Sequence, residues 1–341
     1  MAATQAAILD NEADISTEVL GLNDFAPQAL AHVVAGAEFE HRRLPGGGPS
    51  MHLLQCCLPH SVINRGIYSP AMLVTGTFAS DAVTFGLMLR QREPTILNGD
   101  EVLMGTVQFY TENAEMCYRA WPDATWMTFV ISRERLLQFC LNHLDETPDL
   151  PKRGIMTIEP ESEQSAPRFL DSMRDLSRSL HALGSHRSRA RLGESVEDDL
   201  LARVANLVTA RPLRRPSNDR HRLRLCNEIL RDTIDLVEKN PVEMLDLQSM
   251  SQATGLSPRT LQRTFQAEYG LCPQEWLRVE RLHRVREDLL NGRSGDSVTH
   301  AATRWGFFHL GRFSQYYRDL FGEKPSQTLA RRATVQPLNR W

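Results

Sequence analysis

Arginine and amide side chains recur at helical spacing in one short stretch of the chain. Arg259, Gln262 and Arg263 belong to it, together with Thr260 and Gln266. An arginine can pair bidentately with guanine and a glutamine with adenine, so these side chains on one exposed helix face suit the reading of base edges in a major groove. The stretch therefore predicts a recognition helix.

The flanking residues predict the helix-turn-helix that would present this stretch. Gly255 ends a preceding helical pattern, and Ser257 is suited to cap the next helix by accepting from its first free backbone N–H groups. Pro258 fits the first helical position because it has no N–H to lose there. Leu261 and Phe265, four residues apart, form a stripe that we expect to be buried, which leaves the arginines and amides exposed.

A second stretch, residues 298–322, repeats this pattern with different residues. Trp305-Gly306-Phe307 predicts the turn, and the helix that follows packs through Phe313 and either Tyr316 or Tyr317. One uninterrupted helical pattern over 273–291 links the two copies. A helix of that length spans roughly 28 Å at about 1.5 Å per residue, close to the roughly 34 Å between successive major-groove faces. Two recognition helices joined by one long helix of this length would suit adjacent turns of the major groove.

These two linked motifs give the last third of the chain a resemblance to the AraC/XylS family of bacterial transcription regulators. The residues that carry it are 257–265, Gly270, Arg281-Leu282, Trp305-Gly306-Phe307, Phe313, Phe321-Gly322 and Pro325-Ser326. Within the family, residues 303–329 resemble the ethanolamine-operon regulator subgroup. The resemblance implies a DNA-contacting set on two helices that face adjacent grooves: Pro258, Arg259, Thr260, Gln262, Arg263 and Gln266 on one, and His309, Leu310, Gly311, Arg312, Ser314 and Gln315 on the other.

Composition and charge agree with a two-domain DNA-binding protein. The 341 residues are 41% hydrophobic and 24% charged, and no run of 18 apolar residues would span a membrane. From Arg211 onward there are 22 Lys and Arg against 15 Asp and Glu, so the half with both motifs is basic and the rest is acidic. The six cysteines lack disulfide or metal spacing. We therefore expect a reduced, cytoplasmic, nucleoid-associated protein.

The order of the patterns predicts an α+β multidomain chain. Short alternating runs make residues 20–132 β-rich, with separate strands expected at 61–68, 71–78 and 101–107, a flexible turn at 45–49 and a hairpin at 97–101. Helical periods follow over 133–210, at 133–144, 165–183 and 194–210, and a basic, proline-broken linker occupies 211–221. Residues 1–210 would form an effector-sensing and dimerisation domain, for which the resemblance implies a cupin-like jelly roll. Residues 222–335 would form an all-α DNA-binding domain with two helix-turn-helix units joined by the long helix.

Two other functions were weighed for the first domain. A cupin-type metal enzyme would need paired histidines and a nearby carboxylate, but His32, His41, His52 and His60 do not provide this pattern. We expect no metal, no cofactor and no enzymatic activity. A redox sensor would use the adjacent Cys56 and Cys57, which a strand would direct to opposite faces.

A ligand cavity in the first domain is harder to place from sequence. Its candidate lining is aromatic, namely Phe85, Phe109, Tyr110, Tyr118, Trp121 and Trp126, with Met88, Arg90 and Arg119 as possible contacts for an anion. The sequence as a whole predicts an effector-responsive activator with double-stranded DNA, RNA polymerase, an unknown small molecule and a second copy of itself as partners. The alternative is a regulator whose first domain only dimerises.

Overall fold

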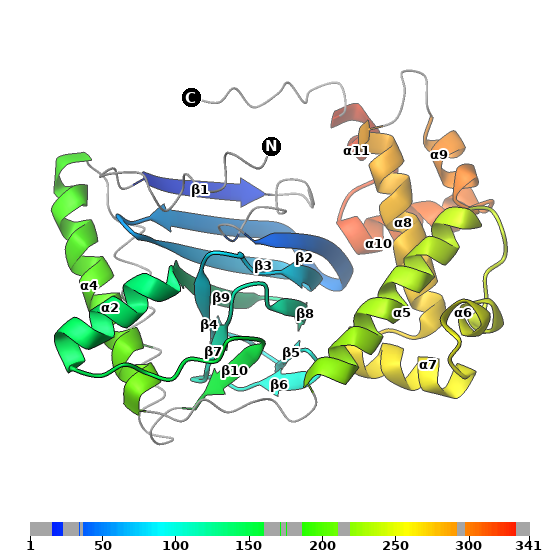
Figure 1. Cartoon of the computed structure of the whole chain (residues 1–341). Coiled ribbons are helices and arrows are strands. Elements are labelled where there is room, and N and C mark those ends of the chain that lie inside the picture. The colour runs from blue at the N-terminus through cyan, green and yellow to red at the C-terminus, as the bar shows by residue number, and fades with distance from the viewer. Residues whose placement is uncertain are drawn as a thin grey trace. The chain divides into compact units, whose positions relative to one another are not determined.

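The computed structural model of the chain describes residues 16–22, 34, 37–159, 171, 175, 186–210, 219–291 and 297–331. The chain divides into two compact units. The first comprises Met1–His41 and Ser50–Asp219 and is rich in strands, and the second comprises Arg42–Pro49 and Arg220–Trp341 and is helical (Figure 1). In the described residues no helix is both long enough and apolar enough to cross a membrane.

The first unit is a strand-rich half-barrel whose described strands form one sheet of ten. Its main path runs β10-β7-β4-β9-β3-β8-β5-β6, and β2 pairs with β1 and β3. The strands are β1 (Ser16–Leu22), β2 (Glu38–Cys57), β3 (Ser61–Thr77), β4 (Val83–Arg90), β5 (Thr95–Leu97), β6 (Asp100–Val102), β7 (Val107–Tyr110), β8 (Glu115–Ala120), β9 (Ala124–Ile131) and β10 (Ile155–Ile158).

Strand β3 corrects the expectation of two strands, 61–68 and 71–78. The strand is continuous, but its first part pairs with β9 through Tyr68, and its second part pairs with β8 from Met72 onward. Pro70 lies between these two ladders, and no registered pair of either ladder includes it. The proline therefore marks a change of partner rather than an end of the strand.

The structure differs from the sequence predictions at three further places in this unit and its strands. Residues 45–49, expected to form a flexible turn, lie within β2, where Arg43 Nη2 donates to the carbonyl of Gly48 at 2.9 Å. Residues 101–107, expected to form one strand, are interrupted because Thr106 N donates to Leu103 O at 3.2 Å in a turn before β7. The strand β10 lies within 133–210, expected to be helical, and pairs with β7.

The turn between β5 and β6 confirms the hairpin expected at residues 97–101. Asn98 and Gly99 both have positive φ, 51° and 89°, as a two-residue hairpin turn with the right-handed twist of its strands requires. Asn98 also accepts from Cys117 N at 2.7 Å through its side-chain oxygen, which ties the hairpin to β8.

Two helices cover one face of this sheet. Helix α2 (Arg133–Leu144) matches its predicted bounds, and α4 (His186–Ala210) extends the helix expected over 194–210. Leu136 of α2 and Leu201 of α4 pack with Phe85 and Phe109 of the sheet in a single hydrophobic core. Glu197 of α4, 2% exposed, accepts from His60 N at 3.0 Å. The helix expected over 165–183 lies outside the described residues except at 171 and 175, which are helical.

The second unit consists mainly of helices. They are α5 (Asp219–Lys239), α6 (Leu247–Thr254), α7 (Pro258–Thr264) with a π-helical turn η3 (Phe265–Tyr269), α8 (Pro273–Asn291), α9 (Val298–Arg304), α10 (Leu310–Phe321) and α11 (Pro325–Arg331). Within this unit α8 has the predicted bounds and contacts α6 near one end and α9 to α11 toward the other (Figure 1). Residues 211–218 of the expected linker lie outside the described residues.

Candidate nucleic-acid interface and ligand cavity

Helix α7 is positioned by its caps, as its sequence predicts. Gly255 ends α6 with a φ of 69°, and the Ser257 hydroxyl accepts from Thr260 N at 3.2 Å. Pro258 occupies the start of the helix. A glycine suits the end of α6 because a left-handed backbone costs other residues strain. The turn between α6 and α7 is therefore short and defined by backbone chemistry.

The inward side of α7 and η3 is aromatic. Leu261 and Phe265 are fully buried, which confirms the predicted stripe. The ring of Phe265 lies 4.9 Å from that of Tyr269 and 6.0 Å from that of Trp276 on α8. The hydroxyl of Tyr269 donates to the carbonyl of Cys226 on α5 at 2.8 Å. These contacts hold the helix against α5 and α8 and leave its other side to solvent.

The outward side of α7 carries the predicted base-reading side chains. Arg259, Gln262, Arg263 and Gln266 are all exposed, and they line a shallow concave surface together with Thr260 and Cys272. The Thr260 hydroxyl lies 2.9 Å from that of Ser257 and is thus engaged in the cap. Among the residues described, neither arginine forms an ion pair, so both guanidinium groups are open to an external acceptor such as a base edge or a phosphate.

Helix α10 presents a different surface. Phe313 and Tyr317 are buried and Tyr316 is 36% exposed, so Tyr317 is the packing residue of the two candidates. The predicted set His309, Leu310, Gly311, Arg312, Ser314 and Gln315 is exposed. Gln315 donates to Asp319 at 2.8 Å and accepts from Arg318 at 2.5 Å, so its amide is engaged along its own helix.

An apolar residue beside α10 was not included among the predicted DNA contacts. Phe308 directly precedes the helix and is 64% exposed, and Leu310 is 37% exposed. Large apolar side chains at such exposure are unusual when they neighbour one another. The sequence signal was present, since two aromatic residues follow Gly306, but hydrogen-bonding chemistry directed the prediction elsewhere.

Polar anchors hold the turn before α10 against α8. Trp305 Nε1 donates to Asp288 Oδ2 at 2.8 Å, and Arg304 Nη1 does so at 3.0 Å. Gly306 has a φ of 79°, and a Cβ there would lie 3.2 Å from the carbonyl oxygen of Pro241. A residue with a side chain would be strained at this position. The geometry of the second helix pair thus depends on α8.

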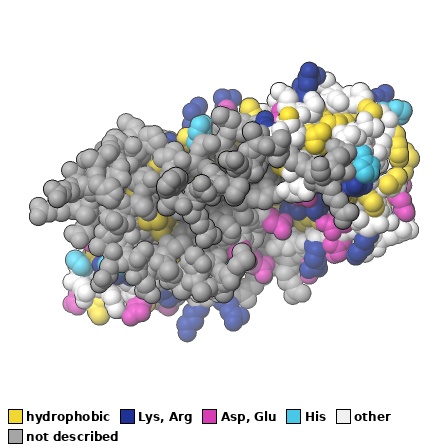
Figure 2. All heavy atoms as spheres, turned by 90° about the horizontal axis from the view of Figure 1, so that it is seen from above, with side chains coloured by type: hydrophobic (Ala, Val, Ile, Leu, Met, Phe, Trp, Pro, Cys, Tyr) yellow, Lys and Arg dark blue, Asp and Glu magenta, His cyan; other side chains and the backbone are white. Residues whose placement is uncertain are grey.

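Charge is distributed in a mixed way outside the α7 surface. On the face drawn in Figure 2, basic, acidic and apolar side chains of the described residues are interspersed. No broad basic patch of described residues is visible on this face.

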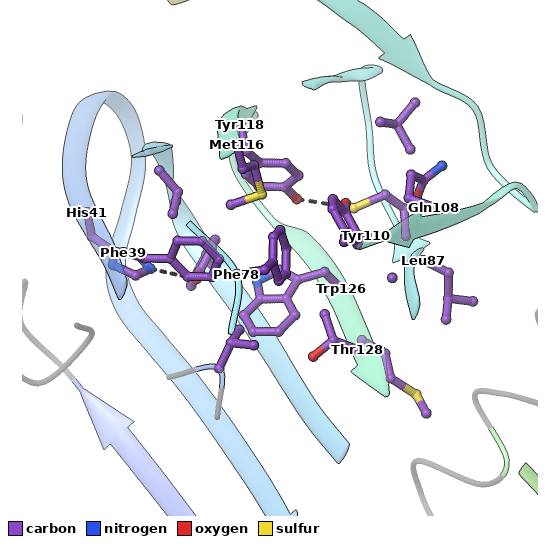
Figure 3. Close-up of a pocket in the computed structure, with 17 residues that line it drawn as sticks. Phe39, His41, Phe78, Leu87, Gln108, Tyr110, Met116, Tyr118, Trp126 and Thr128 are labelled. Atoms are coloured by element: carbon purple, nitrogen blue, oxygen red, sulfur yellow. Dashed lines mark hydrogen bonds between the residues drawn. The ribbon is translucent and has the colours of Figure 1, made fainter. Parts of the chain in front are cut away.

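A cavity lies inside the half-barrel, and most of its lining is on the sheet face opposite the helix-covered core. It measures about 60 Å³, and its walls come from β2, β3, β4, β6, β7, β8 and β9. Figure 3 shows Phe39, Phe78 and Trp126 turned toward this space, together with Tyr110 and Tyr118. Phe78 stacks on Tyr110 with ring centroids 4.1 Å apart.

The structure places the candidate cavity residues in two groups. Tyr110, Tyr118, Trp126 and Met88 line the cavity. Phe85 and Phe109 do not, because successive strand residues point to opposite faces and theirs is the face covered by α2 and α4.

The remaining candidates lie outside the lining. Arg90 is exposed, and Arg119 lies 5.0 Å from the ring of Trp121. The sequence prediction missed several lining residues on β2 and β3, among them Phe39, His41 and Tyr68.

The other functions considered for the first unit find little support in its geometry. No group of three or more His, Cys, Asp or Glu in the described ranges is arranged to hold a metal ion. His32 lies outside the described residues, and His41 lines the cavity. Cys56 is buried in the helix-covered core and Cys57 is half-buried, an alternation that strand geometry explains without redox chemistry.

The family match lies within the second unit. Residues 250–331 match the family described as a helix-turn-helix domain. A probable thc operon regulatory protein of Rhodococcus erythropolis is 36% identical over 102 residues, which cover 30% of this chain and 31% of that protein. An XylDLEGF operon transcriptional activator 2 of Pseudomonas putida is 34% identical over 105 residues, 30% of this chain and 67% of that protein.

A solved structure shows the same partial coverage. An AraC-type transcriptional regulator from Chromobacterium violaceum is 28% identical, with a TM-score of 0.30, and covers 33% of this chain and 97% of its own. The chain spans about a third of the length of the thc relative. Through this C-terminal helix-turn-helix domain, the chain belongs to the AraC/XylS family of transcription regulators.

Proposed function

We propose that this protein is a sequence-specific DNA-binding transcription regulator that activates transcription in response to an effector. The observation that carries the proposal is that Arg259, Gln262 and Arg263 are exposed on one side of α7. The opposite side is buried through Leu261 and Phe265. A short helix that is packed on one side and carries bidentate donors on the other fits a major groove. The relatives named as operon transcriptional activators support activation as the outcome.

We further propose that α6–α7 and α9–α10 are two helix-turn-helix units that read adjacent major grooves. In this proposal α7 contributes Pro258, Arg259, Thr260, Gln262, Arg263 and Gln266, and α10 contributes His309, Leu310, Gly311, Arg312, Ser314 and Gln315. Helix α8 separates the two helix-turn-helix motifs and contacts α6, α9 and α10. The resemblance of residues 303–329 to the ethanolamine-operon regulator subgroup belongs to the same proposal.

The proposed domain plan assigns sensing to the first part of the chain. Residues 1–210 form a jelly-roll-related effector and dimerisation domain, 211–221 a linker, and 222–335 the DNA-binding domain. The cavity in the half-barrel supports a small-molecule effector. RNA polymerase and a second copy of the chain are the proposed protein partners, and the cytoplasm, at the nucleoid, is the proposed location.

Selection of genomic fragments by the full-length protein at two salt concentrations tests DNA reading. We expect a two-part site with centres about 10 base pairs apart. Arg263→Ala should weaken binding to that site by about 1–3 kcal/mol and change binding to random DNA much less, because a lost base contact removes specificity.

A matched control removes a charge elsewhere. Arg153 is exposed in the first unit, and Arg153→Ala should leave both affinities unchanged. If Arg263→Ala lowers affinity equally for selected and random DNA, Arg263 contacts phosphate only and the base-reading role of α7 is wrong.

A further inference from the structure

The cavity wall carries no formal charge near neutral pH. None of its lining residues is Lys, Arg, Asp or Glu. Burial lowers the pKa of His41 to about 4 and raises the pKa of Tyr68, Tyr110 and Tyr118, so all four side chains are neutral at pH 7. An ionised ligand group would lose its water there without gaining an opposite charge, which is strongly unfavourable.

Arg119, a charged neighbour of the lining residue Tyr118, is directed away from the cavity. Met116 and Tyr118 on β8 line the cavity, so Arg119 points to the opposite face of the sheet. Its guanidinium lies over Trp121, with 5.0 Å to the ring centroid. Arg119 is therefore not a counter-ion for a ligand in this cavity.

Several polar groups of the wall contact one another or neighbouring side chains. Tyr68 Oη lies 3.4 Å from His41 Nε2, and Thr128 Oγ1 accepts from Asn64 Nδ2 at 3.1 Å. Gln108 Nε2 donates to Thr106 Oγ1 at 2.9 Å. Tyr118 Oη donates to Met88 Sδ at 3.2 Å, and a thioether is a weak acceptor. The Tyr118 hydroxyl is thus available to a better acceptor. His41 Nδ1 and Trp126 Nε1 are buried without a hydrogen-bond partner in the described part of the chain, and the wall has few further sites for a polar ligand atom.

Ring geometry and size restrict the ligand further. Tyr68 and Trp126 lie edge to face at 5.7 Å, and Figure 3 shows Trp126 and Phe78 among the residues that line the cavity. A Cβ on Gly66 would lie 2.3 Å from the indole of Trp126, so the glycine admits this ring position. The cavity volume of about 60 Å³ is several times the roughly 10–15 Å³ needed for one water. It suits one small ring rather than a long chain or a sugar.

From this wall we propose that the cavity binds a small, neutral, mostly apolar ring compound with one hydrogen-bonding group, and discriminates against carboxylates of the same size. The hydroxyl of Tyr118 donates to that group in place of Met88. The inference rests on the proposed effector response and names the chemical class of its ligand.

Benzyl alcohol and benzoate test the inference, because they share a ring and differ in charge. Equilibrium dialysis of the full-length protein at about pH 7.5 should show one benzyl alcohol per chain, bound at least tenfold more tightly than benzoate. Met116→Lys places an ammonium in the wall and should reverse the preference, which loss of structure cannot do. If that variant does not fold, Gln108→Lys makes the same test from β7.

Leu103→Lys is the matched control, because it adds the same charge at a side chain that is 60% exposed on the first unit. It should keep the wild-type preference. Benzoate binding as tightly as benzyl alcohol to the wild type, or no binding of either probe, overturns the inference. So does benzyl alcohol binding that neither wall lysine alters. DNA-site selection by the same preparation separates the two proposals. If the protein selects a DNA site but fails the ligand test, the ligand inference is wrong and the regulator proposal stands. If it binds the ligand as expected but selects no DNA site, the regulator proposal is wrong.

Discussion

At the residue scale, the two outward helices differ in what they offer to a base pair. Helix α7 presents Arg259 and Arg263 without ion pairs in the described part of the chain, whereas α10 begins with the exposed Leu310 directly after Phe308. Apolar side chains distinguish thymine by contact with its C5-methyl group. If α10 faces a major groove as proposed, its readout rests on methyl contact more than on hydrogen bonds.

Thymine-to-uracil substitution in the second half of the selected DNA site measures this contact. Removing the contacted methyl should cost the wild type about 0.8 kcal/mol, the value of one buried methylene-sized group. Leu310→Ala should weaken binding to DNA that contains thymine. Replacing the thymine by uracil should then cost this variant no further affinity. Equal losses in the wild type and the variant would show that Leu310 does not touch the methyl group.

At the element scale, a buried ion pair joins α8 to the end of the domain. Arg286, 2% exposed, donates to Glu323 Oε1 at 2.5 Å and to Tyr317 Oη at 3.3 Å. Its guanidinium also lies 4.7 Å from the ring centroid of Phe321. Because α8 also holds the turn before α10 through Asp288, the orientation of α10 depends on this helix.

Urea unfolding of Arg286→Met tests the role of the pair. The variant removes a buried charged donor from Glu323, which keeps Arg331 and Thr328 as partners. The second unit should therefore lose about 1.5–3 kcal/mol of its free energy of unfolding, the range for a hydrogen bond to a charged group. Arg286→Met with Glu323→Gln should recover part of the loss.

Arg304→Met is the control for this prediction. It breaks the more exposed pair with Asp288, in which Arg304 is 41% exposed, and should cost less than about 1 kcal/mol. An equal loss in Arg286→Met and Arg304→Met would contradict the assignment of stability to the buried pair.

At the scale of the whole molecule, each unit contains a buried neutral histidine. Burial lowers the pKa of His41 in the first unit and of His283 in the second unit to about 4. An unfolded histidine titrates near 6.5. Below that pH the unfolded state binds a proton that the folded state does not, so stability is complete above about pH 6.5 and falls as the pH drops toward 4.

Unfolding measured at about pH 7.5 and about pH 5 tests this linkage. Each histidine should account for a loss of about 2 kcal/mol in the free energy of unfolding of its unit between these values. His41→Gln should remove the loss in the first unit only, and His283→Gln in the second only. An unchanged pH dependence in either variant would show that its histidine titrates normally in the folded protein.

Much of the second unit was predictable because local rules decide it. The bounds of α8, the Ser257 cap and the buried pair Leu261 and Phe265 follow from helical periodicity and capping chemistry, which act over a few residues. The exposed side of α7 follows as the remainder of the same helix. Sequence periodicity allowed both Tyr316 and Tyr317, and the structure selects Tyr317 because its hydroxyl donates to Thr328 at 2.8 Å.

The first unit was less predictable because strands select partners across long separations. Sequence patterns were enough to predict the β-rich character of the half-barrel, the hairpin at Asn98-Gly99, helix α2 and the family of the DNA-binding part. Packing between distant segments sets the change of partner of β3 at Pro70, and it turns Phe85 toward the helices and Tyr110 toward the cavity. Alternation along a strand defines two faces, but which face meets helices and which encloses a cavity depends on the packing of distant segments.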